Sequence, residues 1–157
     1  MTPTATIAWA ASGAEPDTRV RASLAVSIAR SGDSPAGSLT VEDAAWPHRI
    51  RRVVRANLKQ WGQPDLSASA ELLTTELLTN AFQHGTAPTV TVRLFLTDSL
   101  LCIEVADGSP NRPVARDAAP DDEDGRGLLL VGAIADAWGV SQDGTTTWCS
   151  LSLVKDG

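Results

Sequence analysis

The strongest constraint on the fold is an alternating apolar pattern in the middle of the chain. Apolar residues alternate with mostly polar ones along residues 88–97, and the pattern repeats along residues 100–106 after the dipeptide Asp98-Ser99. A period of two residues places the apolar side chains on one face of a strand. The segment therefore predicts two antiparallel strands joined by a tight turn.

Two helices are predicted before this hairpin. Along residues 43–61 the apolar residues recur at helical spacing and basic residues occupy another side, which indicates an amphipathic helix ended by Gly62. Its basic face is either a solvated surface or a contact for an acidic partner. A second helix follows Asp65 or Ser67 and ends at Gly85. Its leucines surround most of its circumference, so this helix must be largely buried.

The C-terminal part predicts one loop, one helix and one strand. Residues 108–124 contain three prolines and a run of acidic residues without any period, which is typical of a long loop or lid. The apolar run at residues 128–138 predicts a buried helix, and residues 146–154 predict a final strand. The order of elements predicts an α+β two-layer sandwich, with helices on one face of a mixed, mostly antiparallel sheet.

Length and composition predict a single domain with an N-terminal extension. A chain of 157 residues with 43% apolar residues has the size of one ordinary domain. Residues 1–37 are rich in small and polar residues and show weak periodicity, apart from a short possible helix or strand at residues 20–29. We expect residues 1–37 to be a flexible arm, with or without a role in partner binding, and residues 38–157 to be the domain.

Charge and hydropathy exclude two classes of partner. The formal net charge of −6 offers no basic footprint for a nucleic-acid backbone. No segment approaches the ~20 apolar residues that span a bilayer, so we expect a soluble cytoplasmic protein without a membrane partner. Cys102 and Cys149 lie far apart in apolar segments, and we interpret them as buried thiols in a reducing compartment.

The second helix carries an unusual polar stripe. Glu76 and Asn80 are four residues apart and lie on one side of the helix, and Gln83 and His84 continue the stripe. These groups either form hydrogen bonds within the core or perform chemistry. In the second case Asn80 offers an oxygen to Mg²⁺, and Glu76 accepts a proton from an attacking hydroxyl. The spacing alone does not choose between these interpretations.

Three further features follow in the sequence. Asp107-Gly108 ends a strand, where a carboxylate can accept a hydrogen bond from an exocyclic amine, although Asp-Gly is also a common turn. Gly125-Arg126-Gly127 precedes a predicted helix, so its backbone N–H groups can face phosphate or simply form a loop. Gly144-Thr145-Thr146 enters the last strand, where a threonine hydroxyl can support a nucleotide base or have no role. Each feature is weak by itself.

In this order the four features resemble the nucleotide-binding boxes of the ATPase superfamily of gyrase, heat-shock-protein-90, histidine kinases and MutL, which share the Bergerat (GHKL) fold. The Asn-Ala-x-x-His-Gly ending at residues 80–85 and the short Gly-x-Gly-Leu at residues 125–128 look most like the anti-sigma-factor serine/threonine kinases of the RsbW type. The resemblance covers about residues 40–154.

The resemblance implies a role for each matching residue. Asn80 would hold Mg²⁺, and Glu76 would be the general base toward a substrate serine. Asp107, which is followed by Gly108, would bind the adenine amino group, and Thr146 would support the base. The lid over the phosphates would be formed by Gly125, Gly127 and Leu128, with His84 and Arg126 near the phosphates.

The resemblance also implies a function, and one departure from it supports an alternative. It implies a kinase that transfers the γ-phosphoryl group of ATP to an anti-sigma-factor antagonist, that sequesters a sigma factor, and that forms a homodimer. However, Ser109 and Asn111 stand where the superfamily's first glycine box has glycines. The alternatives are therefore a non-catalytic ATP-binding module, or a protein-interaction domain without nucleotide.

Overall fold

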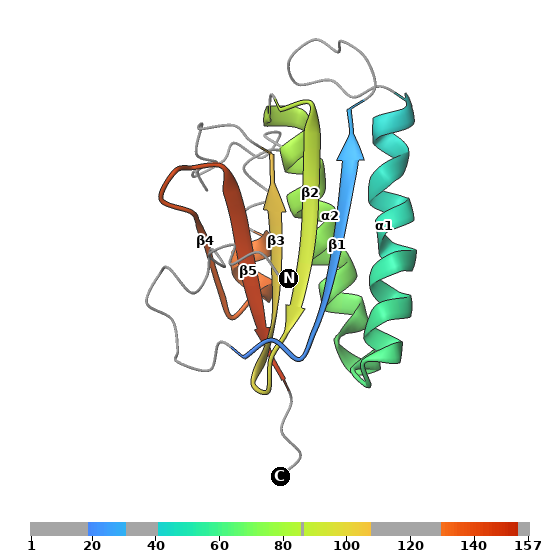
Figure 1. Cartoon of the computed structure of the whole chain (residues 1–157), viewed down its shortest axis with the longest axis vertical. Helices are drawn as coiled ribbons and strands as arrows, with labels where there is room; N and C mark the ends of the chain where they lie inside the picture. Colours follow the sequence, from blue (N-terminus) through green and yellow to red (C-terminus); the bar gives the residue numbers. More distant parts are fainter. Residues whose placement is uncertain (1–18, 31–40, 86, 108–129, 154–157) are drawn as a thin grey trace.

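Two helices cover one face of a five-stranded sheet (Figure 1). The computed structural model describes residues 19–30, 41–85, 87–107 and 130–153. Within these ranges the elements are β1 (Ala22–Ala29), α1 (Val41–Gln60), the short 3-10 helix η2 (Pro64–Leu66), α2 (Ser67–His84), β2 (Thr89–Leu96), β3 (Leu100–Ala106), β4 (Ala137–Val140) and β5 (Thr146–Ser152). The expected α+β two-layer sandwich is confirmed.

The strands follow the order β1-β2-β3-β5-β4 across the sheet. Every strand pairing in the described ranges is antiparallel, so this part of the sheet is not mixed. The predicted turn joins β2 to β3, where the N–H of Thr97 donates to the carbonyl of Leu100 at 2.9 Å. The Thr97 hydroxyl oxygen accepts hydrogen bonds from the N–H groups of Ser99 and Leu100.

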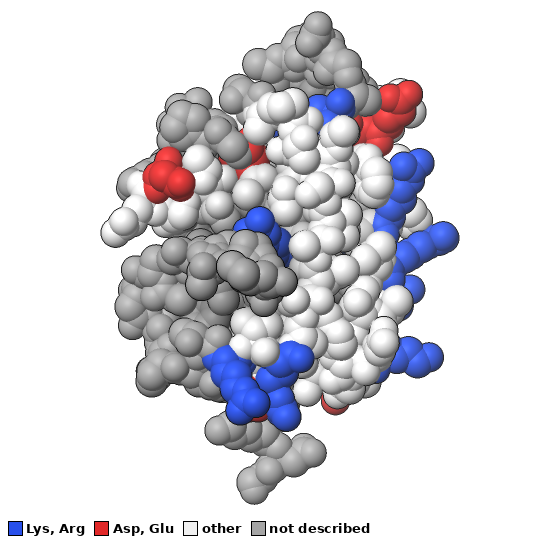
Figure 2. Space-filling view, in the orientation of Figure 1, with Lys and Arg blue, Asp and Glu red and all other residues white. Residues whose placement is uncertain are grey.

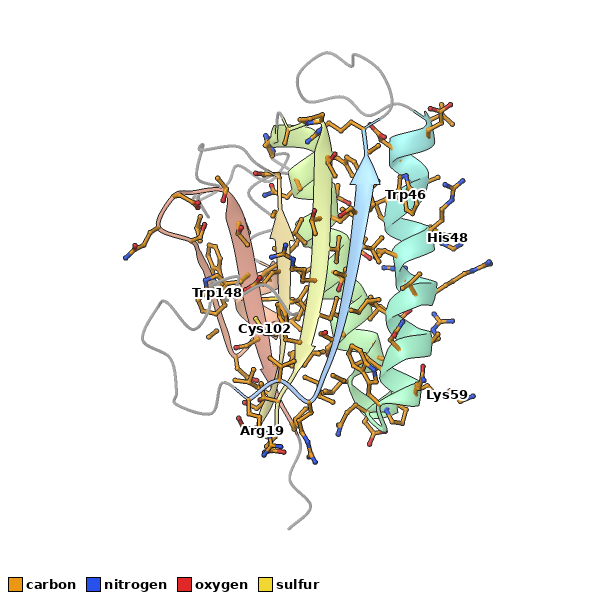
Figure 3. All side chains as sticks on the ribbon, viewed as in Figure 1. Arg19, Trp46, His48, Lys59, Cys102 and Trp148 are labelled. Carbon is orange, nitrogen blue, oxygen red and sulfur yellow. The ribbon has the colours of Figure 1, made fainter. Side chains whose placement is uncertain are left out.

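The main hydrophobic core lies between the sheet and the helices. The alternating residues Val90, Val92 and Leu94 of β2 are fully buried there. Helix α1 contributes Ile50, Val54 and Leu58, and α2 contributes Leu73, Leu77 and Leu78. Burying each aliphatic side chain stabilises the fold by roughly 1.5–3 kcal/mol. On the outer side of α1, His48 and Lys59 point away from the sheet (Figure 3).

A buried carboxylate joins the two helices. Glu71 of α2 forms an ion pair with Arg55 of α1 at 2.7 Å and accepts a hydrogen bond from Ser67 at 2.6 Å. The hydrogen bond from Arg55 is the main reason why the pKa of Glu71 lies below its ordinary value. Further along the same interface, Arg51 donates to the Thr75 hydroxyl at 3.0 Å. These contacts orient the two helices against each other.

The expectation of a flexible arm over residues 1–37 is wrong for residues 22–29. These residues form β1, which pairs with β2 from Ala22 opposite Leu96 to Ala29 opposite Thr89. Its inward side chains pack on the core, and Ile28 is almost fully buried. The strand contains several alanines and serines, so its apolar alternation is weak, and the pairing with β2 decides its conformation. Residues 1–18 and 31–37 lie outside the described ranges.

The expectation of a buried helix over residues 128–138 is also wrong at its C-terminal end. Residues 130–134 are helical, whereas Ala137 and Trp138 belong to β4. Trp138 pairs with Cys149, and Gly139 lies against the Trp148 ring. Pairing with β5 overrides the apolar run, because a short run of this kind does not distinguish a helix from a strand.

None of the helices in the described part of the chain is long and apolar enough to cross a membrane.

Candidate functional site

Helix α2 carries the polar stripe along one edge of the core. Its residues Leu77, Leu78 and Ala81 are buried against the sheet. Glu76 and Asn80 are half-buried, and His84 is exposed in the last turn. The helix ends at Gly85, which has an extended backbone and donates its N–H to the carbonyl of Ala81 at 2.8 Å.

Glu76 has an environment that suits proton transfer. Burial raises the pKa of Glu76 above its ordinary value, and the positive charge of Arg51 partly opposes this effect. A raised pKa makes a carboxylate a stronger base. The hydrogen bond from Arg51 to Thr75 holds the guanidinium at the interface of the two helices. Glu76 thus combines partial desolvation with a nearby cation.

Asp107 is held between the end of α2 and the start of β5. Its N–H donates to the carbonyl of Thr145 at 3.0 Å, and its own carbonyl accepts the N–H of Ala87 at 3.2 Å. A Cβ placed on Gly85 would lie 2.6 Å from the Cβ of Asp107. The end of the stripe helix and Asp107 therefore approach each other closely because residue 85 has no side chain.

Thr146 lies beside Asp107 at the same end of the sheet. It pairs with Ala106 across β3 and β5. The turn before it is fixed by Asp143, whose carboxylate accepts hydrogen bonds from the Ser141 hydroxyl at 2.6 Å and the Thr145 hydroxyl at 2.8 Å. These bonds, with a third from the Thr145 N–H, lower the pKa of Asp143 to about 2. The turn is therefore held by a carboxylate that stays ionised at neutral pH.

The predicted site residues divide into two groups. The structure brings the C-terminal end of α2, Asp107 and Thr146 together, and it places Asn80 about one turn and Glu76 about two turns before the end of that helix. The remaining predicted residues lie outside the described ranges: Gly108, Gly125, Arg126, Gly127 and Leu128. The expected lid over residues 108–124 lies outside them as well.

The donor set suits Mg²⁺ only as part of a nucleotide complex. Within the described ranges, no group of three His, Cys, Asp or Glu side chains is placed to hold a metal ion. Mg²⁺ is commonly held by one or two protein oxygens together with substrate phosphates and water. The half-buried amide of Asn80 fits that requirement as a single protein ligand.

The sequence analysis missed one residue of this region, Arg30. It follows β1, and its guanidinium donates hydrogen bonds to the carbonyls of Ala81, Phe82 and Ala87. No motif pointed to it, because it stands in a segment of weak periodicity. The pairing of β1 with β2 brings Arg30 to the end of α2.

Comparison with known proteins identifies the family of the domain that contains these residues. Residues 39–151 match the histidine kinase-like ATPase domain. The match extends from the residues before α1 into β5, so it includes α2, Asp107 and Thr146, and it leaves out β1. None of the curated proteins matches the chain. The chain therefore belongs to the family of histidine kinase-like ATPase domains, and it is an ATP-binding protein of that family.

Proposed function

We propose that this protein is a cytoplasmic serine/threonine kinase that phosphorylates an anti-sigma-factor antagonist and sequesters a sigma factor. The proposal rests on the family membership and on one observation: the end of α2, Asp107 and Thr146 meet at one end of the sheet. The Asn-Ala-x-x-His-Gly ending at residues 80–85 and the Gly-x-Gly-Leu at residues 125–128, which look most like the RsbW type, support the finer assignment.

Adenine binding is assigned to Asp107. Its backbone is held on both sides, by Thr145 and by Ala87, so the side chain projects from a fixed point. The carboxylate would accept a hydrogen bond from the adenine amino group, and Thr146 would support the base. Asn80 would hold Mg²⁺ together with the phosphates, and the cation would neutralise phosphate charge.

Proton transfer is assigned to Glu76. In the proposed reaction the serine or threonine hydroxyl oxygen forms a bond to the γ-phosphorus of ATP, and the bond to the β-γ bridging oxygen breaks. Glu76 takes the hydroxyl proton, and ADP leaves. The partial burial of Glu76 supports this role, because burial raises its pKa.

The outer face of α1 is the surface that we assign to an acidic protein partner. The basic side chains on it include Arg49, Arg52 and Lys59, which are exposed. Figure 2 shows blue side chains along the edge of the molecule formed by α1. The chain as a whole has a net charge of −6, so this face is a local reversal of sign. A partner with a negative surface would be attracted to it.

Calorimetric titration with Mg-ATP tests the nucleotide site. We expect the wild-type protein to bind, Asp107→Ala to lose binding, and Asn80→Ala to bind with less dependence on magnesium. Asp98→Ala is the matched control, because Asp98 is an exposed carboxylate in the turn before β3, whereas Asp107 follows β3. Absence of binding by the wild-type protein at millimolar ATP would contradict the proposal.

Phosphotransfer to candidate antagonist proteins, followed by mass spectrometry, tests the catalytic assignment. Glu76→Gln is expected to abolish transfer while ATP binding persists, because the amide keeps the shape but cannot accept the proton. Glu42→Gln in the first turn of α1 is the control, because Glu42 is exposed. Loss of both transfer and ATP binding in Glu76→Gln would contradict the assignment of Glu76 as the base.

A second candidate function is supported by one sequence observation. Ser109 and Asn111 stand at two positions where the superfamily's first glycine box has glycine. This departure favours a non-catalytic module that binds ATP as a structural ligand. Persistence of intact ATP beside every candidate partner, with binding still dependent on Asp107, would favour this second function over the kinase.

A further inference from the structure

Arg30 joins four backbone groups around the end of α2. Its Nε donates to the carbonyl of Ala87 at 2.6 Å, and its Nη1 and Nη2 donate to the carbonyls of Phe82 at 2.9 Å and Ala81 at 2.6 Å. Its backbone N–H donates to the carbonyl of Pro88 at 2.8 Å. The guanidinium carbon also lies 5.4 Å from the centroid of the Phe82 ring.

These bonds suit the end of a helix. The last carbonyls of an α-helix have no partner within the helix and carry its partial negative charge, so a cation is favourable there. The planar guanidinium has donors in a fixed fork, which allows one side chain to bridge groups on two segments. Arg30 thus links the last turn of α2 to Ala87, the residue near the start of β2.

The same residue is connected to Asp107 by two routes. Ala87 accepts a hydrogen bond from Arg30 through its carbonyl and donates its own N–H to the carbonyl of Asp107. In addition, a Cβ on Gly85 would lie 2.8 Å from Nη2 of Arg30 and 2.6 Å from the Cβ of Asp107. Arg30 and Asp107 therefore both approach Gly85 closely.

We infer that Arg30 is a positioning residue of the adenine subsite. It acts through Ala87 and Gly85 to fix the place from which the Asp107 carboxylate meets the adenine amino group, and this inference rests on the proposed role of Asp107. Arg30 stands before residue 39, where the match to the ATPase domain begins. The segment upstream of the family's domain thus contributes to nucleotide recognition.

The test compares ATP with purine ribonucleoside triphosphate, which lacks the 6-amino group. Affinities for both are measured by calorimetry on the wild-type protein, Arg30→Gln and Arg30→Lys. We expect Arg30→Gln to weaken ATP binding about tenfold and to change binding of the analogue less than about twofold, so that the preference for ATP falls. Arg30→Lys keeps the positive charge but lacks the forked donors of the guanidinium, so its preference for ATP is expected to lie between those of the wild-type protein and Arg30→Gln. Arg21→Gln is the control, because Arg21 precedes β1, at the end opposite Arg30, and pairs with the exposed Asp98.

Each other outcome has a defined meaning. An equal loss of affinity for both nucleotides would overturn the inference and leave Arg30 a structural residue. An unchanged preference for ATP would overturn it as well. If Arg30→Gln does not fold, Arg30→Lys decides, and failure of both variants to fold counts as a structural role alone. Absence of ATP binding by the wild-type protein would overturn the proposed function itself, and this inference with it.

Discussion

Replacing Gly85 by alanine is expected to disturb both stability and the nucleotide site. The backbone of Gly85 has φ −76° and ψ 157°, which alanine adopts without strain. The added Cβ, however, would lie 2.6 Å from the Ala81 carbonyl oxygen, 2.6 Å from the Asp107 Cβ and 2.8 Å from the Arg30 Nη2. Favourable contacts between carbon atoms lie at about 3.5–4.0 Å. The backbone must therefore move, because a carbonyl oxygen and a Cβ cannot rotate away.

The expected magnitude follows from two opposing effects. Overpacking of this kind costs about 1–3 kcal/mol. Replacing glycine by alanine at a compatible backbone conformation stabilises by about 0.4–1 kcal/mol, because the unfolded chain loses conformational freedom. Because the added Cβ would meet three atoms at once, the upper part of the overpacking range applies, and the net loss in unfolding free energy for Gly85→Ala is about 1–2 kcal/mol. For a chain of this size, this corresponds to a fall in Tm of roughly 2–8 °C.

Gly62→Ala is the matched variant for this experiment. Gly62 has a positive φ of 76°, and a Cβ there would meet nothing within 4 Å. Alanine at this position costs about 1–2 kcal/mol through backbone strain, without any collision. Urea unfolding should therefore show similar losses for the two variants. Calorimetry should show ATP affinity reduced at least about tenfold only in Gly85→Ala, which displaces Asp107. Wild-type stability in Gly85→Ala, or an equal effect of both variants on ATP, would refute the reasoning.

Three further predictions concern ionisable groups. The pKa of Glu71 is lowered mainly by the hydrogen bond from Arg55. The contribution of Glu71 to stability is therefore present above its ordinary pKa of 4.5, and it is lost as the pH falls through the lower pKa of the folded state. Urea unfolding of Glu71→Gln should show a lower unfolding free energy than wild type at neutral pH and a smaller difference in acid. The pKa of Glu76 is raised by burial. Ionisation of Glu76 therefore lowers the stability of the folded protein as the pH rises above 4.5, its ordinary pKa, through its higher folded value. Glu76→Gln should consequently be at least as stable as wild type at neutral pH, and a clear fall in Tm would contradict this. Burial raises the pKa of both thiols, that of Cys149 to about 12. Cys102 and Cys149 should therefore resist thiol reagents in the folded protein and react after denaturation. Rapid labelling of the native protein would contradict this prediction.

The elements that the sequence predicted well have strong local periods. The β2–β3 hairpin and the helices α1 and α2 lie where the apolar spacing placed them, because one face of each is buried in the core. Within the candidate site, the order of boxes singled out Asp107 and Thr146; the structure places both at one end of the sheet, and their roles stay predictions. Gly85 was predicted as the end of a helix and as the last residue of the Asn-Ala-x-x-His-Gly motif, but its close approach to Asp107 was not predicted.

The features that the sequence did not reveal depend on contacts between distant segments. The side chains of β1 are small and mixed, so its place is decided by pairing with β2. The local pattern predicts Trp138 as part of an apolar helix. Its strand conformation depends on its pairing with Cys149 and on the packing of Gly139 against Trp148. Arg30 acquires its partners 51 to 57 positions further along the chain. No local spacing encodes such a contact.

The position of β1 in the sheet has a consequence for how the protein folds. Ser27 of β1 bonds to Thr91 of β2, 64 positions later, and both helices lie between them. During synthesis β1 is made before β2 and has no pairing strand until β2 is complete, whereas α1 and α2 can form in the meantime. Closing so long a segment slows pairing. We expect a folding intermediate in which the helices and the β2–β3 hairpin are formed and β1 is undocked, so that full ATP affinity would appear only when β1 docks.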